Sequence, residues 1–325
     1  MKAIVLREYG DPDVLQLKEV ADPVPRDNEV KVKIVAASVN ATDLEIVRGD
    51  LIVRLSSGLR KPSNSRLGCD FAGRVESIGK NVKQFEQGDE VYADLMYQPR
   101  AYGAFAEYVC IPEKSLRRKP ASMTFEEAAT IPQAGVLAVQ GIRGRIPPRT
   151  GQEILINGAG GGVGTFAIQV AKYFGAEVTA VDNSSKLDMM RELGADHVID
   201  HNNEDFTRSG KRYDLILDVI ARRGILAYRR ALKPTGVFRM VGGTAGRIFQ
   251  ILFLGTLVSR FSSKKIGVLM GSPNKKRDME FLAERFEDKT VVPIIDRIYP
   301  LNEVAEALRY LRDGHAKGKL VITME

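Results

Sequence analysis

The first third of the chain has the alternating pattern of short β-strands. In residues 29–34 (EVKVKI), apolar and charged residues alternate with a period of two, which is typical of a half-buried strand. Short β-rich runs follow at 68–78 and 89–93, and turns containing glycine lie at 79–81 and 87–89. The pattern predicts an antiparallel, barrel-like lobe.

From Thr124 onward, strand-like and helix-like segments alternate. The sequence TFEE at 124–127 has the form of a capping box and predicts the start of a helix. Alternation of strands and helices builds a parallel sheet with helices on both faces. The predicted strands are 153–157, 177–182, 213–220, 237–242 and 265–271, and helical segments are predicted around 167–174, 186–193 and 225–232.

Five glycines fall within the seven residues GAGGGVG at 158–164, between a strand-like run and a helix-like run. A loop that opens a helix presents unpaired N–H groups and the positive end of the helix dipole, so it attracts an anion. Glycine lets a phosphate approach the main chain. The pattern G-x-G-x-x-G fits if alanine takes its first position. The predicted cofactor-binding residues here are Ala159, Gly160, Gly161, Gly162, Val163 and Gly164.

An acidic residue closes the strand that follows this turn. Asp182 lies 21 residues after Gly161, close to the ~20-residue spacing at which a carboxylate accepts hydrogen bonds from the adenosine ribose. A carboxylate there favours NAD, but Ser184 and Lys186 are residues that a 2′-phosphate would contact. The residues alone therefore leave NAD and NADP open. Two structural alternatives to cofactor binding are considered. Lys186 could lie in solvent at the start of a helix, and the glycine-rich turn at 158–164 could serve only the packing of the strand and the helix that it joins.

Length and composition narrow the class of protein. A chain of 325 residues exceeds the ~250–300 at which one core stops growing, so two domains are expected. Two cysteines are too few for a disulfide framework or a closed zinc site, and they favour a reducing, intracellular setting. The amino terminus lacks the apolar core of a signal peptide. The apolar run 248–258 is too short to span a bilayer and is interpreted as a buried helix rather than a membrane-touching or partner-binding surface.

The net charge of +7 arises from 48 Lys and Arg residues against 41 Asp and Glu residues. Such a balance raises the question of nucleic-acid binding, since phosphates attract cations. The densest basic groups, at 222–223, 264–265 and 275–277, contain no interleaved aromatic residues. We interpret the charge as solvated surface, and no nucleic-acid partner is predicted.

Seven segments, in this order, carry a family resemblance. They are AASVNATDLEIVRG (36–49), GCDFAGRVESIGKNVKQFEQGDEVYA (68–93), GAFAEYV (103–109), EEAATIPQAG (126–135), GAGGGVG (158–164), LGADHVID (193–200) and GHAKGKLVI (314–322). With them the chain resembles the medium-chain dehydrogenase/reductase superfamily, and most of all its zinc-independent quinone oxidoreductase branch.

The resemblance implies a fold and an assembly. A β-rich, GroES-like catalytic domain would comprise residues 1–124 and 272–325, and a Rossmann domain with a doubly wound parallel sheet would comprise residues 125–271. The active site would lie in the cleft between them. Gly242 and Gly243 would approach the nicotinamide, and residues 265–271 would pair across the axis of a homodimer. The two cysteines and the polar amino terminus lead us to expect a cytoplasmic location.

The resemblance also implies that no metal is bound. Zinc-dependent members hold the catalytic metal with a Cys, a His and a Cys. The first two ligand positions fall on Asn40 and Cys69, and the region of the third, 133–135, contains no cysteine. Residues 94–102, where a structural-zinc lobe would lie, contain none either. A zinc site needs three such ligands and an open position.

Without a metal, the implied chemistry is hydride transfer to an acceptor that is already electrophilic, such as a quinone or an alkene conjugated to a carbonyl. The resemblance places Asn40 and Asp43 near the substrate, where Asn40 would hydrogen-bond a carbonyl oxygen. It favours NADP(H) slightly over NAD(H). The alternative to a catalytic role is a structural one for both residues, because Asn and Asp side chains commonly hydrogen-bond their own backbone in turns.

Other functions are weighed against this one. The same fold could serve a zinc-free alcohol, aldehyde or alkenal reductase, or a catalytically weak dinucleotide sensor that binds RNA or protein. A related branch reduces enoyl thioesters with a tyrosine from a segment that corresponds to residues 51–67, which contain no tyrosine. Tyr92, Tyr97 and Tyr102 lie beyond it, and the three histidines are too scattered to suggest a triad.

Overall fold

A computed structural model describes residues 1–63, 67–96, 103–144 and 146–324, so Tyr97 and Tyr102 lie outside the described residues. The chain forms two compact units. The first unit comprises residues 1–134, 273–287 and 295–325, and the second comprises 135–272 and 288–294. Residues 125–134 thus pack with the first unit and residues 288–294 with the second, unlike the domain boundaries predicted above.

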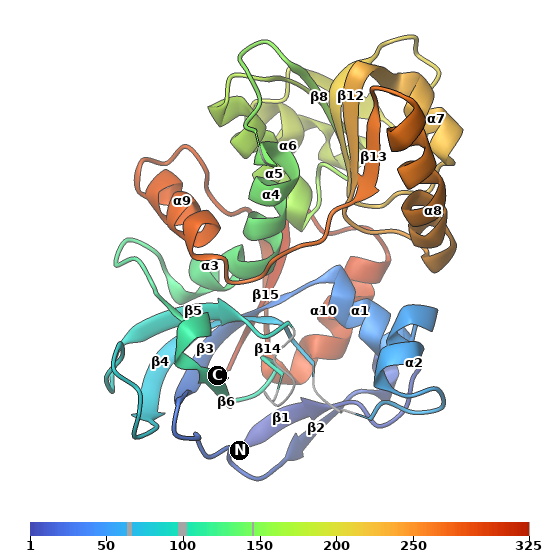
Figure 1. The fold of residues 1–325 in the computed structure, drawn as a ribbon. Coiled ribbons are helices and arrows are strands. Elements are labelled where there is room, and N and C mark those ends of the chain that lie inside the picture. Colours follow the sequence, from blue (N-terminus) through green and yellow to red (C-terminus); the bar gives the residue numbers. More distant parts are fainter. Residues whose placement is uncertain (64–66, 97–102, 145, 325) are drawn as a thin grey trace. The chain divides into compact units, whose positions relative to one another are not determined.

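The first unit is built on a mainly antiparallel seven-stranded sheet, as the alternating pattern predicts (Figure 1). The order is β14-β15-β3-β4-β5-β7, and β6 also pairs with β3; only β14 and β15 are parallel. Within β3, Val30, Val32 and Ile34 are buried. The strands are β3 (Glu29–Val39), β4 (Asp70–Ile78), β5 (Glu90–Asp94), β6 (Tyr108–Pro112), β7 (Arg117–Arg118), β14 (Ile295–Pro300) and β15 (Lys319–Thr323), with a separate pair, β1 (Lys2–Val5) and β2 (Gln16–Glu19).

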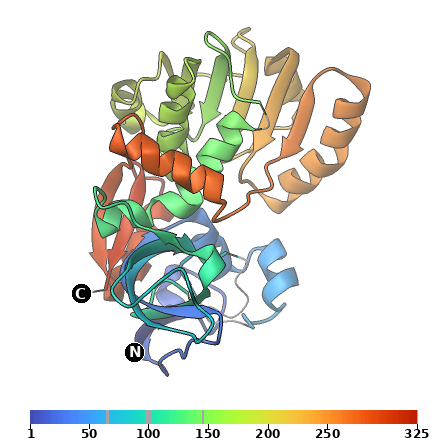
Figure 2. The same cartoon turned by 60° about the vertical axis from the view of Figure 1, so that its left-hand side comes forward.

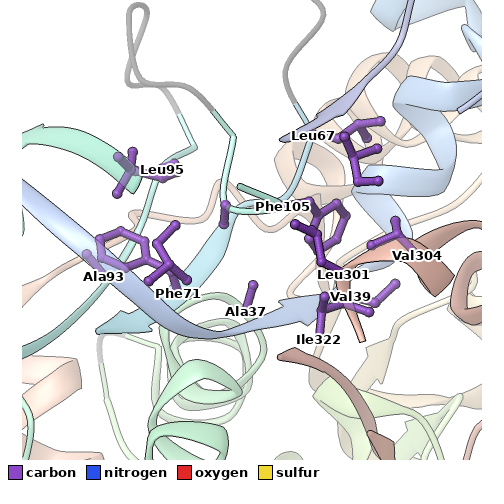
Figure 3. Packing of buried hydrophobic residues seen from close by; sticks show 14 of the residues in the cluster. Ala37, Val39, Leu67, Phe71, Ala93, Leu95, Phe105, Leu301, Val304 and Ile322 are labelled. Atoms are coloured by element: carbon purple, nitrogen blue, oxygen red, sulfur yellow. The ribbon is translucent and has the colours of Figure 1, made fainter. Parts of the chain in front are cut away.

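Residues from both ends of the chain share the core of the first unit. Figure 3 shows Phe105 among Val39, Leu301 and Ile322, all of them buried. The predicted capping box is present, since Thr124 Oγ1 accepts a hydrogen bond from the Glu127 N–H at 3.2 Å and the Glu127 carboxylate accepts one from the Thr124 N–H at 2.8 Å. The helices of this unit include α1 (Ala41–Arg48), α2 (Leu51–Ser57), α3 (Phe125–Ala129), α9 (Lys276–Glu287) and α10 (Val304–Arg312).

The second unit is a doubly wound parallel sheet in the order β10-β9-β8-β11-β12-β13. The strand order reverses between β8 and β11, which is where ligands bind in such sheets. Helices lie on both sides of it (Figure 2). The strands are β8 (Glu153–Asn157), β9 (Glu177–Asp182), β10 (His197–Asp200), β11 (Tyr213–Asp218), β12 (Leu232–Met240) and β13 (Lys265–Val268), and the helices are α4 (Val136–Arg143), α5 (Gly162–Tyr173), α6 (Leu187–Glu192), α7 (Ile225–Ala231) and α8 (Ala245–Phe261).

The prediction of a buried helix at 248–258 is wrong. Only Ile251 and Gly255 of α8 are buried, whereas Phe253 is 71% exposed and Phe261 is 79% exposed. The helix lies beside β13, the last strand of the sheet, and a single narrow face meets the sheet (Figures 1 and 2). Apolar composition therefore did not determine burial here. No helix among the described residues is long and apolar enough to cross a membrane.

Candidate functional site

The glycine-rich turn joins β8 to α5 and is fastened to the neighbouring strand. Gly158 has a φ of +79°, in the region that favours glycine. Its N–H and that of Ala159 both donate to Val181 O of β9, at 2.9 and 3.1 Å. Gly161 is the N-cap of α5, and the first intrahelical bond runs from the Thr165 N–H to Gly161 O. The turn is thus a fixed part of the sheet edge.

Two glycines of this turn serve different purposes. A Cβ on Gly164 would lie 2.3 Å from Gly158 O and 2.5 Å from Ala159 backbone atoms, so the helix crosses the strand end too closely for any side chain. A Cβ on Gly161 would meet only Gly158 O, at 3.5 Å. Residues 161–163 are partly exposed, and the first N–H groups of a helix have no intrahelical partner. The main chain at 161–162, which carries no side chains, fits a pyrophosphate.

Asp182 stabilises the turn itself, a role that the sequence analysis did not foresee. Its Oδ2 accepts a hydrogen bond from the Gly160 N–H at 2.9 Å, and its Oδ1 accepts one from the Asn183 N–H at 2.9 Å. The side chain is 9% exposed. The structure therefore brings Asp182 and Gly160 together, 22 residues apart in sequence.

Lys186 is buried, so the alternative of a solvated position is wrong. The residue is 6% exposed, and its Nζ lies 3.5 Å from Asp182 Oδ1. Its aliphatic chain packs on the turn, since a Cβ on Gly160 would be 2.5 Å from Lys186 Cδ. Ser184, in contrast, is exposed. A positive charge thus lies beside the acidic residue that ends β9.

Gly242 and Gly243 follow β12 at the same edge of the sheet. Because β8, β11 and β12 are parallel, their carboxyl ends meet there. Gly242 O accepts a hydrogen bond from the Ala221 N–H at 3.0 Å, and a Cβ on Gly242 would lie 2.8 Å from Val219 O. These two glycines therefore lie at the same edge of the sheet as the glycine-rich turn, with β11 between β12 and β8.

In the first unit, Asn40 and Asp43 stand at the start of α1. The Asp43 carboxylate accepts hydrogen bonds from the Asn40 N–H at 2.8 Å and from the Gly68 N–H at 3.0 Å. The backbone role that was considered as their alternative is therefore present. The Asn40 amide makes further contacts, and its catalytic role stays a prediction.

The amide of Asn40 has a fixed orientation. Its Oδ1 accepts a hydrogen bond from Lys319 Nζ at 2.6 Å, while its Nδ2 donates to Asp70 Oδ2 at 3.0 Å and to Ser38 O at 3.4 Å. An ammonium group can only donate, so the amide oxygen must face it and the NH2 must point the other way. Lys319 therefore orients the Asn40 side chain.

Lys319 and Asp70 form a buried ion pair. Lys319 Nζ lies 3.7 Å from Asp70 Oδ2 and donates to Val39 O at 3.0 Å. The side chains are 2% and 0% exposed. Ser38 Oγ donates to the same Asp70 oxygen at 2.9 Å, whereas Asp70 Oδ1 has no partner among the described residues. Asp70 and Lys319 lie in two of the segments that carry the family resemblance, but no local pattern marks either as a functional residue.

A third carboxyl group faces this pair. Asp94 of β5 stands directly opposite Asp70 of β4 in the antiparallel register. Its Oδ1 accepts a hydrogen bond from the Met96 N–H. Burial, reinforced by the Asp70 carboxylate, raises the pKa of Asp94 to about 8, and burial raises the pKa of Asp43 to about 7. The cluster therefore holds protons near neutral pH.

Cys69 lies in the same cluster as a buried thiol. Its Sγ is 3.9 Å from Asp43 Oδ1, and burial followed by the Asp43 charge raises the pKa of the thiol well above its usual range. Zinc binds the thiolate rather than the thiol. Within the four described ranges of the chain, no group of three His, Cys, Asp or Glu residues is arranged to hold a metal ion.

Two known families match parts of the chain. The family description "Alcohol dehydrogenase GroES-like domain" matches residues 26–121, and "Zinc-binding dehydrogenase" matches residues 193–322. The chain is 32% identical to 2-methylene-furan-3-one reductase of Solanum lycopersicum, over 99% of this chain and 79% of that protein. It is 31% identical to the chloroplastic NADPH-dependent alkenal/one oxidoreductase of Arabidopsis thaliana, with the same two coverages of 99% and 79%. The solved quinone oxidoreductase of Coxiella burnetii superposes with a TM-score of 0.88 at 27% identity, covering 100% of this chain and 99% of that one.

Proposed function

The chain is an oxidoreductase of the medium-chain dehydrogenase/reductase superfamily, and from that premise we propose that it uses NAD(P)H to reduce a quinone or an α,β-unsaturated carbonyl compound without zinc. The observation that carries the proposal is the bare main chain at 161–162, at the start of α5 and at the carboxyl edge of the parallel sheet. Two relatives named for an alkenal/one and a quinone support the class of acceptor.

The proposed cofactor-binding residues are those of the turn and the adjacent strand ends. Within 159–164, the N–H groups at the start of α5 would hold the pyrophosphate, because the Ala159 and Gly160 N–H groups already donate to Val181 O and Asp182. Gly242 and Gly243 leave the end of β12, two strands from β8, free of side chains. When bound, the nicotinamide cofactor supplies the hydride. Asp182 keeps Gly160 in place for this contact.

We propose NADP(H) as the preferred cofactor. A lone carboxylate at the end of β9 would repel a 2′-phosphate, but Lys186 Nζ lies 3.5 Å from Asp182 and offsets its charge. Ser184 is exposed beside it and can donate a hydrogen bond. The Arabidopsis relative is named as NADPH-dependent, which agrees with this preference.

For the acceptor, we propose that Asn40 donates a hydrogen bond to a carbonyl oxygen as negative charge develops there. The distance from Asn40 Nδ2 to Ser38 O is 3.4 Å, longer than the usual 2.7–3.2 Å for an N–H donor. We therefore expect this amide hydrogen to leave Ser38 O and donate to the carbonyl oxygen of the acceptor. Asp43 fixes the Asn40 backbone. Asp43 would thus act by positioning its neighbour.

The proposed reaction needs no zinc. Asn40 stands where the first zinc ligand of the related enzymes is expected, and its amide oxygen is occupied by Lys319. Cys69 stands at the second ligand position as a protonated thiol. These two contacts argue that the protein polarises its acceptor with hydrogen bonds instead of a metal.

The test is a steady-state comparison of NADPH and NADH oxidation with a quinone, an alkenal and a saturated aldehyde, each with and without a chelator. We expect activity on the quinone or the alkenal that the chelator leaves unchanged, and a preference for NADPH. Activity on the saturated aldehyde alone would favour the alternative, a zinc-free alcohol or aldehyde reductase of the same fold. Activity lost to the chelator and restored by zinc would refute the metal-free reaction.

The assembly and location expected from the sequence remain proposals. β13 is the last strand of its sheet, and its free edge supports the proposal of a homodimer formed by strand pairing. Light scattering on the purified chain tests it through the molar mass. A cytoplasmic location is the matching proposal, and fractionation of cells tests that.

A further inference from the structure

Basic residues are concentrated in one part of the second unit. Residues 219–272 contain ten of the 48 Lys and Arg residues of the chain and none of its 41 Asp and Glu residues. The rest of the chain therefore carries a small excess of acidic residues. The net positive charge of the chain therefore comes from this segment, which includes α7, α8 and β13.

The same segment carries an exposed apolar face. Phe249, Phe253, Leu257 and Phe261 recur every four residues along α8 and all are exposed, as are Leu252 and Leu254 beside them. Residues at this spacing lie along one side of a helix. Their exposed fractions range from 42% to 79%. Isolated apolar residues are common on surfaces, but a row of this length marks an interaction site.

Cations lie at both ends of this helix and just after it. Arg247 and Arg260 belong to α8 itself, and Lys264 and Lys265 follow it. Lys264 Nζ donates to Arg229 O and Leu232 O at 2.6 and 2.8 Å, which ties it to the end of α7. Arg223 and Lys233 of the same segment pair with carboxylates outside it, whereas none of the four cations on or after α8 lies within 4.0 Å of a carboxylate of the described residues.

The gathered charges also affect each other. Burial, followed by the charges of Arg212 and Arg229, lowers the pKa of Lys264. Like charges held at this proximity are unfavourable on an isolated surface. An anionic partner would remove that repulsion, so the segment is electrostatically suited to one.

We propose that α8 and its flanking cations bind an anionic lipid surface. The Phe and Leu side chains of the exposed face would enter the boundary between head groups and acyl chains, while the Arg and Lys side chains contact the head groups. Helices that bind in this way combine a Phe- or Leu-rich face with Lys and Arg. Basic clusters are attracted to acidic lipids within about a Debye length of the surface.

A second copy of the chain fits this face less well. A two-fold contact would bring Arg260 and Lys264 of one copy towards the same cations of the other, with no carboxylate in 219–272 to neutralise them. Pairing of β13 strands about an axis normal to the sheet is a different contact, and it would leave both copies of α8 on one face of the joined sheet. RNA would contact the cations but leave the apolar row in water.

The inference is independent of the proposed reaction, because vesicle binding is measured without cofactor or acceptor. We would sediment the full chain with vesicles of phosphatidylcholine alone and of phosphatidylcholine mixed with phosphatidylglycerol. At physiological salt we expect about tenfold more bound protein with the anionic vesicles, falling as salt is raised.

Matched variants locate the surface. Phe253→Glu should abolish vesicle binding, while Val24→Glu, at a residue that is 83% exposed in the first unit, should leave it unchanged. Arg260→Glu should weaken binding severalfold, and Lys83→Glu, an equal charge change at an exposed residue of the first unit, should have a smaller effect. The thermal midpoint of each variant shows whether it is folded.

Three results would overturn the proposal. One is equal binding to both vesicle types or to neither. Another is vesicle binding by Phe253→Glu at the level of the unmodified chain. The third is an unmodified chain that binds RNA but no vesicles, which would assign the face to nucleic acid. If instead the unmodified chain binds no vesicles and Phe253→Glu has a lower molar mass in light scattering than the unmodified chain, the face is a contact with a second copy.

Discussion

The glycine-rich turn of the second unit and the polar cluster of the first unit are built in opposite ways. The turn is formed by main chain, and its key feature is that side chains are missing at 160–162 and 164. The cluster is formed by buried side chains, with Asp70, Asp94 and Lys319 almost completely covered. A site of the first kind tolerates changes of pH, whereas a site of the second kind depends on the proton occupancy of its members.

The two regions also differ in how far apart their parts lie in sequence. The turn and Asp182 fall within one strand-helix-strand unit. The contact between Asn40 and Lys319 spans 279 residues. The cluster therefore forms only when the end of the chain joins the first sheet, and the following substitutions test how strongly each region depends on its members.

The largest loss of stability is expected for Lys319→Met. It would leave Asp70 buried without its partner, and breaking a buried ion pair costs about 3–5 kcal/mol. Urea unfolding measures the free energy of unfolding. The double variant Lys319→Met with Asp70→Asn removes both charges and should recover a large part of the loss. Losses that simply add would show that the two side chains do not interact.

Gly164→Val should damage both the fold of the turn and cofactor binding. A Cβ there would be 2.3 Å from Gly158 O, and forcing extra atoms into a packed site costs about 1–3 kcal/mol. We expect no measurable NADPH binding in calorimetric titration and a lower unfolding midpoint. Binding at wild-type affinity would contradict the assignment of the turn to the phosphate.

Replacement of Asp94 by Asn should change the pH dependence of stability. The folded pKa of Asp94, about 8, is above its unfolded value, so its protonated form stabilises the protein below about pH 4 and that stability is lost as the pH rises to 8. Asp94→Asn should therefore gain up to ~1.4 kcal/mol relative to the wild type for each pH unit in this window. Unfolding at a series of pH values tests this, and parallel curves for the two proteins would contradict it.

The smallest effects concern the choice of cofactor. Lys186→Met should weaken NADPH binding several-fold more than NADH binding, because it removes the cation beside Asp182. Asp182→Ala should weaken NADH more than NADPH if the carboxylate contacts the ribose. Titration of each variant with both cofactors gives the ratios. Equal changes for the two cofactors in either variant would mean that the side chain only supports the turn.

The sequence predicts the turn well because its signals are local. Glycines, the strand before them and the helix after them are visible in one short segment, and the structure contains each of these elements. The strand β3 was predictable for a similar reason, since burial of one face imposes alternation. β10 was not predicted, because this short edge strand is only partly buried and shows little pattern.

The polar cluster and α8 could not be predicted in the same way. Asp and Lys usually lie at the surface, so nothing in the local pattern marks Asp94 or Lys319 as buried; only the pairing of β4 with β5 and of β15 with β3 brings them together. For α8, a helix that is apolar on all sides is expected inside a protein. Its place beside the last strand leaves most of it exposed.

Gly161→Asp provides the most direct test of the central claim, that a pyrophosphate binds the bare main chain at the start of α5. Gly161 is the N-cap of that helix, where Asp is favoured, and its Cβ would meet only Gly158 O at 3.5 Å. We predict an unfolding midpoint that is not lowered and a loss of NADPH binding in calorimetric titration. The carboxylate introduced by Gly161→Asp would fill the phosphate site and repel the phosphate. A folded Gly161→Asp variant that binds NADPH as tightly as the wild type would contradict the account.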